Sequence, residues 1–131
     1  MAAKPQVSFR LDKLVRGKLP EMMREMGQEP EVTVLEGEDL QRALIAKVAE
    51  EVAELDPNDP SYQKELADLL QAMKDLIAVS GGEAVIERLR QADEERRGGF
   101  LAGQFITRLQ LEPDDRWVEY YRREPKKYPE G

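Results

Sequence analysis

The sequence predicts an all-α protein in which an antiparallel helical hairpin completes a four-helix bundle by oligomerisation, with short extended segments beside it. Apolar residues recur every three or four positions in two long central stretches, as on one face of a helix. Aromatic residues make up only 6% of the chain and leave little material for a β-sandwich. Two helices with short flanking pieces bury little apolar surface alone, so we expect a second hairpin to complete the core.

The N-terminal part is expected to hold one short helix. Residues 4–19 are basic and irregular, and Pro20 suits the first turn of a helix that Gly27 can end. The β-branched run at residues 32–35 lies between a proline and a glycine. It is expected to form either a short strand or an extended arm.

Two long amphipathic helices are predicted in the middle of the chain. Residues 39–55 form the first, with an apolar stripe along one face. The second runs from Pro60 to about residue 79, with Asp59 as its N-cap and Gly81 in the stop signal. Because the turn between them is short, the two helices should pack as an antiparallel hairpin.

The C-terminal part is less regular. A further helix is expected near residues 83–96, and residues 105–111 form either a strand or a short helix. The proline-containing remainder is expected to be a tail on the surface or on a partner. We therefore predict one domain, residues 1–112, followed by a C-terminal tail, residues 113–131.

Charge and hydropathy exclude several partners. A net charge of −7 argues against binding duplex nucleic acid by neutralising many phosphates. No apolar run is long enough for a membrane span, and residues 1–6 lack the apolar core of a signal peptide. The expectation is a cytoplasmic protein without a membrane partner, and the lack of cysteine is consistent with that.

Two carboxylate clusters lie on the long helices: Glu50, Glu51 and Glu54, then Glu65 and Asp68. The first three fall within a sector of about 100° beside the apolar stripe, and both clusters should lie at similar distances from the turn. The chain has no histidine and no cysteine, so a metal site must use oxygen ligands. Such ligands suit Mg²⁺, Mn²⁺ or Ca²⁺, and a divalent cation would relieve the repulsion among the carboxylates.

The acidic residues also fit a simpler interpretation. Glutamate-rich helix faces are common and are more often solvated than metal-bound. Lys47, four residues before Glu51, and Lys64, beside Glu65, then serve as ordinary ion-pair partners.

The acidic clusters, in this order, resemble the paired motif of the all-α nucleoside triphosphate pyrophosphohydrolases, which include MazG-type enzymes and phosphoribosyl-ATP pyrophosphohydrolase. Residues 13–21, KLVRGKLPE, are similar to the KLVRDKIPE opening of the phosphoribosyl-ATP pyrophosphohydrolase-like branch. Residues 95–100, ERRGGF, are similar to its ERGGF ending. The resemblance covers about residues 10–111, and Gly17 replaces the aspartate of the family.

The resemblance implies a Mg²⁺-dependent enzyme, with Mn²⁺ as a substitute, that cleaves the α–β phosphoanhydride of a nucleoside triphosphate and releases a monophosphate and pyrophosphate. It implies catalytic roles for Glu50 and Glu51, with Glu50 a nearby ligand or the base that orients water. The implied metal ligands are Glu51, Glu54, Glu65 and Asp68. A metal-bound water needs no histidine as its base.

Three basic residues are candidates for the phosphate tail, because guanidinium and ammonium groups pair well with phosphate oxygens: Arg16, Lys18 and Arg97. Ordinary surface solvation explains each of them equally well. In a homodimer or homotetramer, these residues of one subunit can approach the carboxylates of another.

Two other functions remain open. The substrate can be phosphoribosyl-ATP, since the basic opening motif does not separate the two branches. Alternatively, the chain is a non-catalytic helical oligomer that binds a nucleotide or a protein, which Gly17 and the short turn favour.

Overall fold

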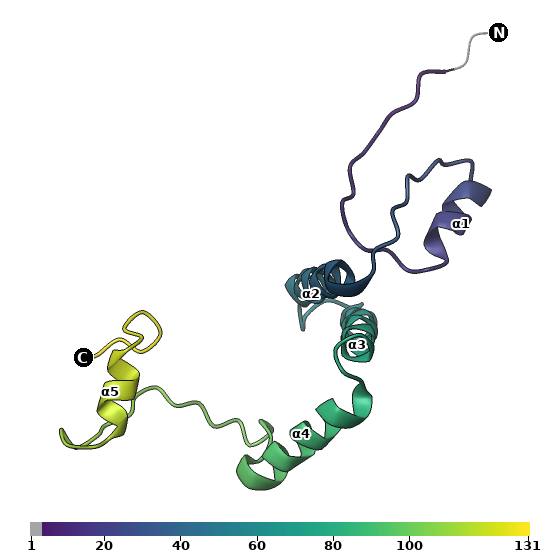
Figure 1. The fold of residues 1–131 in the computed structure, drawn as a ribbon. Helices are drawn as coiled ribbons and strands as arrows, with labels where there is room; N and C mark the ends of the chain where they lie inside the picture. Colours follow the sequence, from purple (N-terminus) through teal and green to yellow (C-terminus); the bar gives the residue numbers. More distant parts are fainter. Residues whose placement is uncertain (1–3) are drawn as a thin grey trace. The chain divides into compact units, whose positions relative to one another are not determined.

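The structure is a computed structural model that describes residues 4–131, and every regular element in this range is a helix (Figure 1). The absence of strands from the described residues confirms the all-α class. None of the described helices is both long and apolar enough to cross a membrane. The helices are α1 (Leu19–Glu25), α2 (Gly37–Ala53), α3 (Tyr62–Ala78), α4 (Glu83–Arg97) and α5 (Trp117–Arg122).

The chain divides into two compact units, Met1–Glu95 and Arg96–Gly131. The first unit contains α1, α2, α3 and nearly all of α4, and the second contains α5. The candidate site described below lies entirely in the first unit. The functional boundary between residues 112 and 113 stays a prediction.

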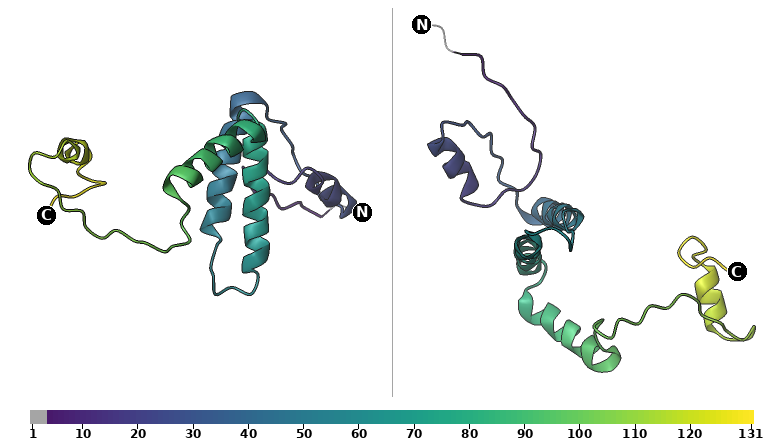
Figure 2. Two further views of the ribbon diagram at one scale, coloured as in Figure 1. Left: turned by 90° about the horizontal axis from the view of Figure 1, so that it is seen from below. Right: turned by 180° about the vertical axis from the view of Figure 1, so that it is seen from behind.

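Helices α2 and α3 form the antiparallel hairpin, and they are the only helices within residues 4–131 that pack extensively against each other. Figure 2 shows the two helices side by side, joined at one end by a short loop. Leu44 of α2 and Ala72 of α3 are the buried hydrophobic residues of the described chain. This small core leaves other apolar side chains of the hairpin exposed, among them Leu70 at 61%.

The start of α3 differs from the prediction. The helix begins at Tyr62, and its N-cap residue Ser61 makes no side-chain capping bond. One Asp59 carboxylate oxygen instead accepts hydrogen bonds from the Ser61 backbone N–H at 2.8 Å and from the Ser61 hydroxyl at 2.7 Å. Asp59 as the N-cap was therefore wrong, because its carboxylate closes a turn of the loop, and Pro60 belongs to that turn.

The other helix ends lie close to the predicted ones. Pro20 lies in the first turn of α1, as expected. Gly81 and Gly82 separate α3 from α4, with φ angles of 103° and 93° that disfavour other residues. The Gly82 N–H donates to the Ile77 carbonyl at 3.2 Å and so closes the end of α3.

Two apolar segments have no regular structure. Residues 32–35 do not form the strand. Residues 105–111 form neither a strand nor a helix, so that prediction was wrong. A strand needs a partner for its backbone hydrogen bonds, and the described chain offers none, while Phe105 and Ile106 stay exposed.

The region after residue 112 is more ordered than the predicted tail. Helix α5 starts where the Asp115 carboxylate accepts a hydrogen bond from the Trp117 N–H at 2.8 Å. The chain then folds back, and the rings of Tyr121 and Tyr128 meet edge to face with centroids 4.9 Å apart. A six-residue helix is too short to be evident from apolar periodicity, which explains why α5 was missed.

Candidate metal centre

Three carboxylates from the two hairpin helices meet at one place. Glu51 of α2 and Glu65 and Asp68 of α3 each offer an oxygen atom that lies within 4.8 Å of the other two. We call these three residues the acidic triad. The hairpin brings them together because Glu51 is near the end of α2 and the other two are near the start of α3.

Glu51 is the buried charged residue of the described chain, with 7% of its surface exposed. Its Oε1 lies 3.3 Å from the Lys47 Nζ. Its Oε2 is buried and has no hydrogen-bond partner. An unsatisfied buried oxygen of a charged group costs about 1–3 kcal/mol or more, so the Oε2 of Glu51 is a strong candidate to bind a cation.

Glu54 lies beside the triad. Because α2 ends at Ala53, Glu54 is the exposed C-cap residue rather than part of the helix. Partial burial raises the pKa of Glu65, and the negative charge of Glu54 and a hydrogen bond with it raise that pKa further. The charges of Asp68 and Glu51 act in the same direction. The four residues predicted as metal ligands are thus electrostatically coupled, which a divalent cation would relieve.

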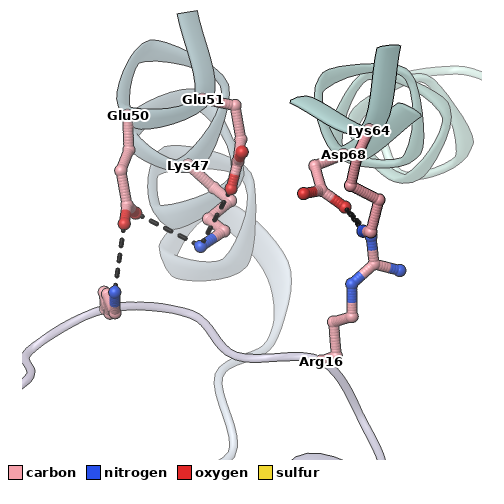
Figure 3. A network of polar contacts seen from close by, with 7 residues as sticks. Arg16, Lys47, Glu50, Glu51, Lys64 and Asp68 are labelled. Carbon is pink, nitrogen blue, oxygen red and sulfur yellow. Dashed lines mark hydrogen bonds and ion pairs between the residues drawn. The ribbon is translucent and has the colours of Figure 1, made fainter. Parts of the chain in front are cut away.

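Asp68 is paired with two cations, as Figure 3 shows. Its Oδ1 accepts hydrogen bonds from the Lys64 Nζ at 2.6 Å and from the Arg16 Nη2 at 2.7 Å. The Lys64 bond, and then the Arg16 bond, hold the pKa of Asp68 below its ordinary value against the opposing effect of partial burial. Lys64 and Lys47 therefore form ion pairs, as expected for an ordinary charged helix face. Their partners, however, are the triad residues Asp68 and Glu51.

Glu50 lies outside the triad. Its Oε1 accepts a hydrogen bond from the Lys13 Nζ at 3.1 Å, and its Oε2 accepts one from the Lys47 Nζ at 3.3 Å. Both carboxylate oxygens therefore have lysine partners. A role for Glu50 as ligand or base stays a prediction.

A cavity of about 230 Å³ opens beside the triad, between the N-terminal segment, α2 and α3. Its lining includes two triad carboxylates and three cationic side chains, so it suits a ligand that carries both a metal ion and anionic groups. The lining residues are Leu14, Val15, Arg16, Leu44, Lys47, Glu51, Lys64, Asp68, Gln71, Ala72 and Asp75.

Sequence reasoning missed Gln71 and Asp75 in this cavity. They follow Asp68 by three and seven residues, which is the spacing of one helix face. The Gln71 amide donates to both Asp75 carboxylate oxygens at 3.2 Å. The position of Gln71 and Asp75 on the same helix face as Asp68 could have identified them from the sequence.

Two predicted phosphate-binding residues are not among those that line the cavity. The exposed Lys18 directly precedes α1, and its side chain makes no hydrogen bond or ion pair with residues 4–131. Arg97 is the last residue of α4 and belongs to the second unit. Phosphate binding by these two residues stays a prediction, whereas Arg16 lines the cavity.

Comparison of the chain with models of known protein families, with curated proteins and with solved structures found no match. The resemblance of its motifs to the all-α nucleoside triphosphate pyrophosphohydrolases therefore stays a hypothesis.

Proposed function

We propose that this protein is a nucleoside triphosphate pyrophosphohydrolase of the all-α family that depends on Mg²⁺ or Mn²⁺. It cleaves the α–β phosphoanhydride of its substrate and releases a nucleoside monophosphate and pyrophosphate. The observation that carries the proposal is the buried, unpartnered Oε2 of Glu51 within a convergent carboxylate triad.

The donor set fits a hard divalent cation. Glu51, Glu65 and Asp68 supply oxygen ligands only, and Glu54 lies close enough to raise the pKa of Glu65. Mg²⁺ prefers a few carboxylates and keeps several waters, and the cavity beside the triad leaves room for such waters. When bound, the cation would neutralise charge on phosphoryl oxygens and lower the pKa of a bound water.

The cavity supplies groups for the phosphates. Arg16, Lys47 and Lys64 line it together with Glu51 and Asp68 of the triad. Guanidinium and ammonium groups form strong charge-assisted hydrogen bonds with phosphate oxygens. A triphosphate bound to a divalent cation fits this cavity better than a neutral ligand does, because the carboxylates can bind the cation and the basic side chains can bind the phosphates.

The hairpin also favours assembly with a second copy. Apolar side chains on both helices remain largely exposed in the single chain, among them Ile45 at 57%, Val52 at 51% and Leu70 at 61%. Apolar surface of this kind is usually covered in a stable protein. A second hairpin would bury it in a four-helix bundle, which gives a homodimer or homotetramer.

The function is tested by incubating the protein with Mg²⁺ and a panel of nucleoside triphosphates that also contains phosphoribosyl-ATP, and by following the products with phosphorus NMR. We expect a monophosphate and pyrophosphate as the early products. The Glu51→Gln variant, which keeps the shape of the side chain, serves as the inactive control. Orthophosphate as the sole early product, or nucleotide binding without turnover across the panel, would contradict the proposal.

A further inference from the structure

We propose that Glu50 is a positioning residue rather than a metal ligand. Through Lys13 it fixes residues 13–16, which we call the strap, across the hairpin, and through Lys47 it orients Glu51. This inference rests on the proposed function for the identity of the ligand, a divalent cation with a phosphate chain. It assigns to Glu50 a role in holding the phosphate-binding side of the cavity.

Glu50 joins two elements that are far apart in sequence. Its Oε1 accepts the hydrogen bond from Lys13 at 3.1 Å across a separation of 37 residues, and its Oε2 accepts the one from Lys47 at 3.3 Å. The bond from Lys13 holds the pKa of Glu50 below its ordinary value. A carboxylate with both oxygens engaged by ammonium groups is a poor additional ligand for a cation on the triad, because its charge is already neutralised and the two ammonium groups repel the cation.

Lys47 connects Glu50 to the triad. Its Nζ lies 3.3 Å from the Glu50 Oε2 and 3.3 Å from the Glu51 Oε1, and Figure 3 shows its ammonium group between the two carboxylates. Because Lys47 holds one oxygen of Glu51, the other oxygen is the one left without a partner. In this proposal, the bond to Glu50 holds Lys47 at Oε1 of Glu51 and so leaves Oε2 for a cation.

The strap has a second attachment point on the other helix. Arg16 donates to Asp68 of α3 at 2.7 Å, whereas Lys13 donates to Glu50 of α2. Three residues of extended chain reach at most about 10 Å, which matches the usual 8–10 Å between the axes of packed helices. The half-buried Leu14 and Val15 between these two cations form a wall of the cavity. The Lys13 attachment therefore determines where Arg16 stands relative to the triad.

The proposal predicts different effects of Glu50 on the affinity for Mn²⁺ and on the affinity for pyrophosphate. If Glu50 were a metal ligand, its loss would lower both affinities. Mn²⁺ binding is measured by electron paramagnetic resonance, and binding of inorganic pyrophosphate in the presence of Mn²⁺ is measured by calorimetry. For Glu50→Gln we expect a change in Mn²⁺ affinity of less than about threefold, because the glutamine oxygen can still accept from Lys47, which stays paired with Glu51. We expect a loss of pyrophosphate affinity of about tenfold, the size of one lost hydrogen bond to a charged group. The exposed Glu38→Gln on α2 is the matched control.

Lys13 tests the same contact from the other side. Lys13→Ala should reproduce the loss of pyrophosphate affinity, and Lys13→Arg, which keeps the ion pair, should stay within about twofold of the unchanged protein. Trypsin should cleave after Arg16 at least about fivefold faster in Lys13→Ala and Glu50→Gln, because the strap is released. Arg10→Ala, a change of equal charge at an exposed residue whose side chain makes no hydrogen bond or ion pair within residues 4–131, should alter neither measurement.

A double-mutant cycle decides whether the two residues act through one contact. If they do, Lys13→Ala should add little to the effect of Glu50→Gln on pyrophosphate affinity. Additive losses would overturn the proposal, and so would a loss of Mn²⁺ affinity in Glu50→Gln as large as in Glu51→Gln. None of these measurements depends on turnover, so a protein that hydrolyses no nucleotide would refute the proposed function and leave this test intact.

Discussion

The hairpin and helix α4 are both rich in glutamate, yet their charges are arranged differently. On α4, Arg90 pairs with Glu87 and Glu94, and the side chains of these three residues are 45–58% exposed. On the hairpin, the Glu51 side chain is only 9% exposed, and one of its oxygens has no partner. A dense run of charges is therefore not by itself a site. Burial of an incompletely paired carboxylate among other carboxylates marks the hairpin as the place where a cation is expected.

The α4 network shows the outcome of full pairing. Hydrogen bonds from Arg90 to Glu87, and then to Glu94, raise the pKa of the guanidinium above its ordinary value. They also hold the pKa of Glu87 below its ordinary value. Every charge in this network has an opposite neighbour on the same helix, so no binding of an external ion is required. In the triad, partial burial and then the negative charges of the neighbouring carboxylates raise the pKa of Glu65.

The largest effect is expected from the buried member of the triad. Removal of a supporting residue of a metal site costs about 10–100-fold in affinity, so loss of a ligand in Glu51→Gln should weaken Mn²⁺ binding by about 100-fold or more. Titration followed by electron paramagnetic resonance measures this. Glu94→Gln on α4 makes the same chemical change on an exposed side chain and should leave Mn²⁺ affinity unchanged. Equal Mn²⁺ affinities of Glu51→Gln and Glu94→Gln would show that the hairpin and α4 do not differ in cation binding.

Cation binding should also stabilise the fold. A ligand that binds only the native state at 100 times its dissociation constant adds about 2.7 kcal/mol to the free energy of unfolding. Urea unfolding at increasing Mg²⁺ should show this gain for the unchanged protein and for Glu94→Gln. The Glu51→Gln variant should show none of it. A gain of equal size in Glu51→Gln would place the cation elsewhere.

The exposed α4 network should matter little for stability. Exposed ion pairs contribute about 0–1 kcal/mol each, so Arg90→Ala should lower the free energy of unfolding by no more than about 1 kcal/mol beyond the change in helix propensity. Its Mg²⁺ stabilisation should match that of the unchanged protein. Urea unfolding in the absence and presence of 1 M salt checks this, because screening should abolish most of the difference.

The smallest effect concerns the turn that joins α2 and α3. Hydrogen bonds from Ser61 hold the pKa of Asp59 below its ordinary value. The pKa of Asp59 is therefore lower in the folded protein than in the unfolded protein. The contribution of Asp59 to the free energy of unfolding is present at pH values above the unfolded-state pKa, and it is lost as the pH falls through the folded-state pKa. Ser61→Ala should therefore reduce stability near neutral pH but not in acid. Thermal unfolding between pH 7 and roughly pH 2 tests this, and a constant difference across that range would contradict it.

Most of the helical framework could be predicted, because its signals are local. The predicted ranges 39–55, 60–79 and 83–96 agree within two residues with the ends of α2, α3 and α4. Apolar periodicity, a short turn rich in aspartate and proline, and a pair of glycines act over a few neighbouring residues. The failures occurred where the outcome depended on distant partners, as in residues 105–111, which have no strand to pair with.

The site was predicted in part. The sequence pattern identified the carboxylates that now form the triad, together with Glu54 and the basic residue Arg16. It named Glu51 as a metal ligand and Glu50 as a nearby ligand or base, but it did not show that one carboxylate is paired with two lysines and the other is buried. Adjacent residues on a helix differ by about 100° in direction, so the rotation of α2 about its axis decided their surroundings.

The sequence by itself determined that this chain is helical, that two of its helices form a hairpin, and that any metal site must consist of oxygen ligands. Those properties follow from periodicity, turn residues and composition, which need no knowledge of distant contacts. Only the tertiary structure decided which carboxylates converge, which oxygen is left without a donor, and which lysine ties the strap to α2. The physical reason is distance along the chain, since the contacts from Lys13 to Glu50 and from Arg16 to Asp68 join residues 37 and 52 positions apart.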